Sequence, residues 1–240
     1  PRKTASCDGC YSWSTFEAMH EETLSGGNST DVVRVDGAVH RRAGLWASAV
    51  HALLRTLRAA GIEEVPEPRG FDDDGREVLS FLPGDVGTYP LPDWLWSSVI
   101  LDDAGALLRR IHDASVVLLE ADLPWGFPRR EPAEVICHND VAPYNMVFSG
   151  GRVTGLIDFD TAAPGPRAWD LAYLAYRIVP ITTDRSDGFT DQQRGERLRH
   201  LIEVYGLDAS SRQVLEEVIV RLLALASHSD EAAVSLENPE

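Results

Sequence analysis

The chain has few cysteines and no pattern that builds a disulfide framework. Its 240 residues include three, Cys7, Cys10 and Cys137, whereas a small secreted fold held by disulfides needs an even set. Cys7 and Cys10 have the spacing of half a zinc site, but no second cysteine pair completes four ligands. The alternative for this segment is a terminal extension with two free thiols. A reducing compartment, the cytoplasm, is therefore expected.

Long apolar runs and an excess of positive charge are also absent. No stretch reaches the roughly 18 consecutive apolar residues that a membrane span requires, and Arg2 and Lys3 are not followed by the apolar core of a signal peptide. The net charge of -16 argues against a nucleic-acid partner, because phosphate-backbone binding depends on excess lysine and arginine. This charge suits a cationic small molecule, or reflects solubility alone.

What remains is the composition of a well-packed protein. Hydrophobic residues make up 44% of the chain, which argues against extensive disorder. The length suits one large domain or two lobes with a sizeable core. The sequence has no apparent internal repeat and gives no oligomeric state.

Residues 134–160 carry the densest set of chemically useful side chains. An apolar run at 135–137 stops at a polar triplet that ends in Asp140, Asn145 follows, and a second apolar run ends on Asp158. Two strands are therefore expected to deliver acidic residues to the same edge. Phosphoryl transfer needs a carboxylate that accepts a hydroxyl proton, and oxygen ligands that hold Mg²⁺ on the nucleotide phosphates. Alternatively, the three side chains are loop caps at strand ends.

The order of these residues resembles that in a known family. His138-x-Asp140, an Asn five positions after the Asp, and Asp158-Phe159 after the next hairpin are similar to the catalytic and metal-binding segments of the aminoglycoside phosphotransferase and choline kinase family, which in these parts is similar to the protein kinases. The resemblance implies that Asp140 is the catalytic base and that Asn145 and Asp158 bind Mg²⁺.

The resemblance also implies supporting and substrate-binding roles. His138 would hold the catalytic loop by hydrogen bonds, and Asp170, at the start of a helix, would support the same loop. Residues 180–197 read as an acidic loop. In enzymes of the aminoglycoside type, acidic side chains of the C-terminal lobe bind substrate ammonium groups, so the candidates here are Asp184, Asp187 and Asp191.

In the N-terminal part, a turn and a hairpin are expected to hold the nucleotide. Asp36-Gly37 predicts a tight hairpin between strands at 31–35 and 38–41. The lysine that meets the phosphates in the family then corresponds to Arg41, which is bulkier and stacks differently. Before the hairpin, a flexible segment can bring N–H groups to a phosphate, or is a plain turn; its residues are Ser25, Gly26, Gly27, Asn28 and Ser29.

The following helix, at 43–61, departs from the family. Kinases pair the basic residue with a Glu on this helix, yet the segment contains no carboxylate, and Val50 and His51 lie near the expected position. Either Arg41 has no such partner, or Arg41 is not the phosphate ligand. A strand at 77–82 then ends in Pro83-Gly84. The resemblance implies a hinge here, where backbone groups bind adenine; its residues are Ser80, Phe81 and Leu82.

Together these observations predict an α+β, two-lobed protein-kinase-like fold with an antiparallel sheet in a small N-terminal lobe and a larger, mostly helical C-terminal lobe. The expected division is an extension at 1–21, a nucleotide-binding lobe at 22–82 and a catalytic and substrate-binding lobe at 83–240. The predicted activity is Mg²⁺-dependent transfer of the γ-phosphoryl group of ATP or GTP to a hydroxyl of a cationic acceptor, such as an aminoglycoside or related antibiotic. The alternatives are a catalytically silent nucleotide-binding or scaffold protein of the same fold, and a soluble α/β protein unrelated to kinases.

Overall fold

The N-terminal part is a five-stranded antiparallel sheet with strand order β1-β2-β3-β5-β4. The computed structural model describes residues 21–23, 32–181 and 188–237. The predicted hairpin is confirmed, because Val35 pairs with Ala38 across Asp36 and Gly37, whose φ values of 48° and 75° are those a two-residue turn requires. The strands are β1 (Glu21–Thr23), β2 (Val33–Val35), β3 (Ala38–Arg42), β4 (Pro68–Phe71) and β5 (Arg76–Ser80).

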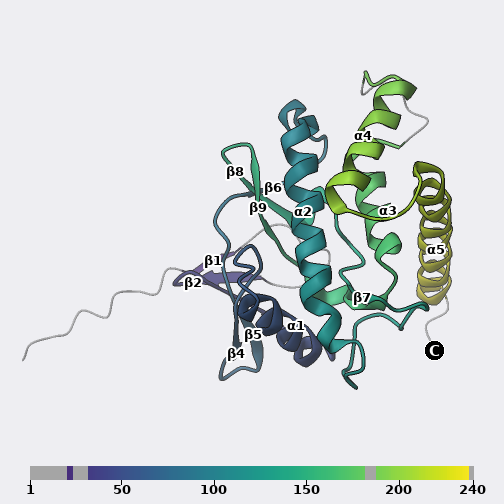
Figure 1. Cartoon of the computed structure of the whole chain (residues 1–240). Helices are drawn as coiled ribbons and strands as arrows, with labels where there is room; N and C mark the ends of the chain where they lie inside the picture. Colours follow the sequence, from purple (N-terminus) through teal and green to yellow (C-terminus); the bar gives the residue numbers. More distant parts are fainter. Residues whose placement is uncertain (1–20, 24–31, 182–187, 238–240) are drawn as a thin grey trace, which may run out of the picture.

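Helix α1 (Ala47–Ala59) packs beside this sheet (Figure 1). Its apolar positions recur every three or four residues and are buried, as the sequence predicts. His51 lies among them and is 2% exposed. A histidine buried to this degree needs a polar partner, and the helix itself supplies no carboxylate. The buried apolar face consists of Val50, Leu53, Leu54 and Leu57.

Two small sheets follow, and they separate strands that the sequence suggested would share an edge. Strands β6 (Asp85–Val86), β8 (Met146–Ser149) and β9 (Arg152–Leu156) form one sheet, whereas β7 (Val135–Cys137) pairs with β10 (Ala163–Gly165) in another. The expectation of one common edge is therefore wrong, and the loops after β7 and β9 must meet by other contacts. The chain leaves the five-stranded sheet at Ser80 and enters the next at Asp85; the division into lobes near residue 83 stays a prediction.

Four long helices lie in the described C-terminal part. Helix α2 (Ser98–Ser115) runs between the strands and helices α3 (Arg167–Ile178), α4 (Asp191–Tyr205) and α5 (Ser211–Glu237) (Figure 1). Helix α4 begins at Asp191, so the loop predicted for 180–197 is wrong in its second half. The first turns of α4 are polar, so the spacing of apolar residues does not indicate where the helix begins. A capping box stabilises these turns, with Thr190 and Gln193 bonded reciprocally. None of the helices in the described ranges is both long and apolar enough to span a membrane.

The helices share a buried polar contact in addition to their apolar core. His112 of α2 is fully buried, with Nδ1 2.6 Å from the Tyr205 hydroxyl and Nε2 3.1 Å from Oδ2 of Asp170. Burial alone would raise the pKa of Asp170, but the hydrogen bond and charge of His112, together with His138, lower it. The carboxylate therefore stays charged in the core, and one contact joins α2, α3 and α4.

Removing the Tyr205 hydroxyl should destabilise the fold, because Nδ1 of His112 would then be buried without a partner. We expect Tyr205→Phe to lower the free energy of unfolding by about 1–3 kcal/mol, measured by urea denaturation. Tyr89→Phe is the matched control: Tyr89 is half-exposed, its hydroxyl has no hydrogen bond among the described residues, and the change should stay within about 0.5 kcal/mol. Equal effects of the two variants would contradict a structural role for the Tyr205 hydroxyl.

Candidate functional site

The loop that carries Asp140 rests on a single buried carboxylate. Oδ2 of Asp170 accepts the backbone N–H of His138 at 2.6 Å, and Oδ1 accepts that of Asn139 at 2.8 Å. Asn139 has a φ of 67°, a left-handed conformation that asparagine tolerates better than most residues. Asp170 lies in the first turn of α3, a helix that begins directly after Pro166. The helix start therefore fixes the backbone immediately before Asp140.

Side-chain bonds join this loop to the segment that carries Asp158. His138 donates from Nε2 to the Ile157 carbonyl at 3.0 Å, while its Nδ1 accepts the N–H of Asp140 at 3.2 Å. Asn139 donates to the Thr161 carbonyl, and the Thr161 hydroxyl donates to the His138 carbonyl, both at 2.8 Å. These contacts bring together the loop after β7 and the loop after β9, two strands of different sheets.

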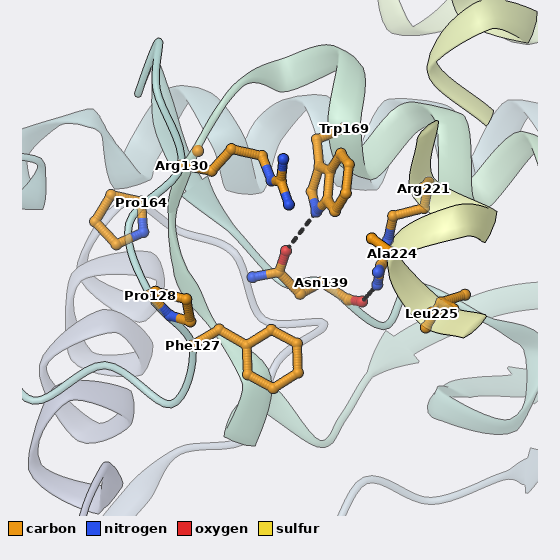
Figure 2. A pocket seen from close by; sticks show the side chains of 10 residues that line it. Phe127, Pro128, Arg130, Asn139, Pro164, Trp169, Arg221, Ala224 and Leu225 are labelled. Atoms are coloured by element: carbon orange, nitrogen blue, oxygen red, sulfur yellow. Dashed lines mark hydrogen bonds between the residues drawn. The ribbon is translucent and has the colours of Figure 1, made fainter. Parts of the chain in front are cut away.

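The reverse side of the loop is held by α5 and Trp169 (Figure 2). The Asn139 side-chain oxygen accepts the Trp169 indole N–H at 2.8 Å, and its backbone carbonyl accepts a hydrogen bond from Arg221. Arg221 is 4% exposed, and burial lowers its pKa. A pocket of about 100 Å³ lies here, lined by Phe127, Arg130 and the three residues just named, among others. Asp140 does not line it, so this pocket is separate from the predicted catalytic groups.

The three predicted catalytic and metal-binding residues lie together. Asn145 donates from Nδ2 to Oδ2 and to the backbone carbonyl of Asp140, both at 2.9 Å. The Ile157 N–H donates to the Asn145 carbonyl at 2.8 Å, which sets Asp158 beside Asn145. The side chain of Asp158 is 48% exposed. No described residue donates to the Asn145 side-chain oxygen, so this oxygen and the Asp158 carboxylate offer the hard oxygen ligands that Mg²⁺ prefers.

The other oxygen of Asp140 is bonded to a tyrosine. The Tyr144 hydroxyl donates to Oδ1 of Asp140 at 2.6 Å and lies 3.1 Å from the Tyr173 hydroxyl. Burial, and then the hydrogen bond to Asp140, raise the pKa of Tyr144. The hydroxyl therefore keeps its proton and occupies the side of the carboxylate that faces α3.

Arg41 lies at the centre of an acidic cluster. Its Nε donates to Glu77 at 2.6 Å, one Nη donates to Asp158 at 3.1 Å, and the other bonds Asp160. Burial acts to lower the pKa of Arg41, but the charges of Asp160, Glu77 and Asp158 outweigh it and raise the pKa above its ordinary value. Arg41 thus lies next to the candidate metal ligand Asp158.

The carboxylate that α1 lacks is supplied by β5. Arg41 and Glu77 are directly opposed residues on neighbouring strands, and Glu77 is 1% exposed. Nε2 of His51 lies 2.9 Å from the second Glu77 oxygen, a close contact that is poorly directed for a hydrogen bond. Burial lowers the pKa of His51 more than Glu77 raises it. Arg41 therefore has a carboxylate partner, and His51 lies behind that partner.

The remaining predicted site residues are only partly described. Asp191 is the first residue of α4. In the predicted hinge, the N–H groups of Ser80 and Phe81 already donate to Glu67 and Gly37. Among those three residues, Leu82 alone has a backbone N–H without a partner in the described part of the chain. The other predicted site residues lie outside the described part of the chain: Ser25, Gly26, Gly27, Asn28, Ser29, Asp184 and Asp187.

Sequence reasoning gave no role to Glu77 or Arg221, although a signal for each was present. Glu77 shares the inward face of an alternating strand with Leu79, and Arg221 follows Val214 and Val218 on the buried stripe of α5. Charged residues are rarely buried unless they are paired. A charge at a core-facing position therefore predicts a buried partner, here Arg41 and the Asn139 carbonyl.

Comparisons with known proteins identify a family for the chain. The model of the phosphotransferase enzyme family matches residues 117–209. The trifolitoxin immunity protein of Rhizobium leguminosarum bv. trifolii is 33% identical over 234 residues, which cover 92% of this chain and 88% of that protein.

Solved structures share the fold at low sequence identity. ADP-bound aminoglycoside phosphotransferase APH(2'')-Ib has a TM-score of 0.61 at 13% identity, covering 94% of this chain and 88% of that one. A choline/ethanolamine kinase family protein from Mesorhizobium loti has a TM-score of 0.52 at 20% identity, covering 89% and 82%. The predicted two-lobed, kinase-like α+β fold is thereby confirmed. The chain belongs to the phosphotransferase enzyme family of the aminoglycoside phosphotransferase and choline kinase type.

Proposed function

We propose that this protein is a small-molecule kinase that transfers the γ-phosphoryl group of ATP or GTP to a hydroxyl of an acceptor. The observation that carries the proposal is the grouping of Asp140, Asn145 and Asp158, with the Asn145 amide donating to Asp140 at 2.9 Å. A base close to two oxygen ligands for Mg²⁺ is what in-line phosphoryl transfer uses.

In this proposal Asp140 orients the acceptor hydroxyl and takes its proton. The acceptor oxygen bonds to the γ-phosphorus, the bond from that phosphorus to the bridging β–γ oxygen breaks, and the nucleoside diphosphate leaves. Such a base contributes about 10²- to 10⁴-fold in rate. Tyr144 now donates to Oδ1 of Asp140, so the acceptor hydroxyl takes over this hydrogen bond when it binds.

The neighbouring residues hold the nucleotide. Asn145 and Asp158 are the proposed Mg²⁺ ligands, and Mg²⁺ would neutralise negative charge on the phosphates. Arg41 is the proposed phosphate ligand, positioned by Glu77 through the 2.6 Å hydrogen bond. A turn is the proposed site for the phosphates, and its residues are Ser25, Gly26, Gly27, Asn28 and Ser29. The hinge at 80–82 is the proposed site for the adenine ring of the nucleotide. In this hinge the candidate donor is the N–H of Leu82, which has no partner among the described residues.

The proposed acceptor is a small molecule with a cationic group, as the net charge of -16 suggests. A toxin or antibiotic is supported by the similarity to the trifolitoxin immunity protein and to aminoglycoside phosphotransferase APH(2'')-Ib, and resistance would be the biological result. Asp191, with Asp184 and Asp187, remains a proposed ligand for ammonium groups. A cytoplasmic location stays a prediction.

One observation favours a second candidate, a catalytically silent nucleotide-binding or scaffold protein. Arg41 binds Asp158, a proposed metal ligand, and also Asp160, so a guanidinium neutralises charge where Mg²⁺ would bind. A kinase must exchange the Asp158 contact for Mg²⁺ when the nucleotide enters. Turnover separates the two candidates.

Asp140→Asn should remove turnover and retain nucleotide binding, because the amide keeps the size of the side chain but accepts no proton. We expect a loss of at least about 10²-fold in nucleotide consumption with Mg²⁺, ATP or GTP, and a panel of aminoglycosides, basic peptide antibiotics and amino alcohols. The exposed Asp208 supplies the control variant Asp208→Asn, expected to behave as wild type. Parallel loss of turnover and binding would indicate that Asp140 maintains structure instead.

Asp158→Asn should weaken the magnesium complex of the nucleotide, because a charged ligand is replaced by a neutral one. We expect the gain in ADP affinity on adding Mg²⁺, measured by calorimetry, to fall by about tenfold, which corresponds to about 1.4 kcal/mol. An unchanged magnesium dependence would remove Asp158 from the metal shell.

Glu77→Gln should release Arg41 from the position in which it meets the phosphates. Losing a charged hydrogen bond in the core should cost roughly 1.5–3 kcal/mol of unfolding free energy, and we expect the KM for the nucleotide to rise while the KM for the acceptor stays constant. Glu216→Gln, on the exposed face of α5, controls for the loss of one negative charge. A stability loss with an unchanged nucleotide KM would make Glu77 a structural residue only.

A further inference from the structure

Arg177, near the C-terminal end of α3, has no ion pair or hydrogen bond among the described residues. Its Nε is buried and has no partner. Arg197 also has a buried Nε without a partner, yet it donates to the carbonyls of Trp96 and Ile178 at 2.6 and 2.8 Å. Arg177 has no such carbonyl contacts. The chain has 38 acidic and 22 basic residues, so an arginine without an acidic partner is unexpected in it.

Aromatic rings surround the Arg177 guanidinium. Its central carbon lies 5.0 Å from the ring centre of Tyr89, 5.1 Å from that of Tyr144, and 5.8 Å from those of Tyr173 and Tyr176. These distances are within the range of cation–π contacts. Rings stabilise the charge without using its N–H groups, which stay available for an oxygen acceptor.

This cluster lies directly beside the proposed base. The Tyr144 hydroxyl bonds both Asp140, at 2.6 Å, and the Tyr173 hydroxyl, at 3.1 Å, and both rings contact Arg177. The segment with Tyr89 is fixed to the same loop, because the Gly87 N–H donates to the Pro143 carbonyl at 2.8 Å. Tyr89 is 50% exposed, so the cluster reaches the surface on this side of Asp140.

We propose, resting on the proposed function above, that Arg177 binds a carboxylate of the acceptor. A planar guanidinium whose N–H groups are free binds a carboxylate through two parallel hydrogen bonds, and partial burial strengthens the pair. The acceptor is then a hydroxy acid, and with the cationic group inferred from the net charge it is a hydroxy amino acid or a peptide with a free carboxyl terminus. Amino alcohols and aminoglycosides lack this carboxylate.

The test uses ligand pairs that differ at the carboxylate. The pairs are L-serine and ethanolamine, L-homoserine and 3-amino-1-propanol, and a seryl dipeptide with a free or an amidated carboxyl terminus. Their dissociation constants are measured by calorimetry on the protein saturated with Mg²⁺ and a non-hydrolysable ATP analogue. We expect the carboxylate member of at least one pair to bind about tenfold or more tightly than its partner, since hydrogen bonds between charged groups are strong.

Arg177→Gln should reduce the preference for the carboxylate member of a pair to less than about twofold, because the charged guanidinium that donates the hydrogen bonds is lost. Arg212→Gln is the matched control, because Arg212 is exposed and pairs with Glu216 on α5; it should keep the preference. Affinity for the magnesium nucleotide should be unchanged in both variants.

Three results would overturn the assignment of Arg177: equal or tighter binding of the members without a carboxylate, a preference that survives Arg177→Gln, or no binding of any pair by protein that holds the nucleotide. Failure of the wild-type protein to bind the magnesium nucleotide would instead refute the kinase function itself. The two failures are therefore distinguishable in one titration series.

Discussion

The buried carboxylate of Asp170 is the interaction on which the rest of the site depends. Its two oxygens hold the backbone of His138 and Asn139, and one also contacts His112, which reaches Tyr205. The helices α2, α3 and α4 therefore meet at the group that shapes the loop before Asp140. Arg221 adds α5 through the Asn139 carbonyl. The packing of the helices and the placement of the proposed base therefore depend on each other, because a buried charge is stable only while all its partners stay in place.

Around Arg41, the proposed phosphate ligand, the balance of charge matters more than which strand or helix supplies the carboxylate. The chain contains a single lysine, Lys3, so the β3 residue that meets the carboxylates is an arginine, Arg41. Its carboxylate partner comes from the neighbouring strand as Glu77 instead of from α1. Arginine has a planar donor group that bonds several carboxylates at once, and Arg41 contacts Glu77, Asp158 and Asp160. These three contacts explain how Arg41 is paired although helix α1 contains no acidic residue.

The sequence predicted local features well and long-range partners poorly. The Asp36-Gly37 hairpin and the apolar face of α1 follow from turn chemistry and periodicity, whereas the grouping of Asp140, Asn145 and Asp158 was implied by the resemblance of the ordered motif to the family. The sequence did not show how the loops after β7 and β9 meet, because their contact depends on hydrogen bonds of His138 and Thr161 between strands of different sheets. The start of α4 at Asp191 was missed because a capping box, not an apolar stripe, stabilises its polar first turns. The aromatic cluster around Arg177 joins residues far apart in the chain, among them Tyr89, Tyr144 and Tyr173. No local sequence pattern predicts it.

We propose that Asp140, Asn145 and Asp158 form a centre for phosphoryl transfer to a hydroxyl. The most direct measurement is ³¹P nuclear magnetic resonance of the protein incubated with Mg²⁺, ATP or GTP, and candidate acceptors that include hydroxy amino acids and aminoglycosides. We expect a new phosphomonoester signal that grows as the γ-phosphate signal declines, with equal formation of the nucleoside diphosphate. An unchanged spectrum with bound nucleotide, or release of inorganic phosphate alone, would contradict it.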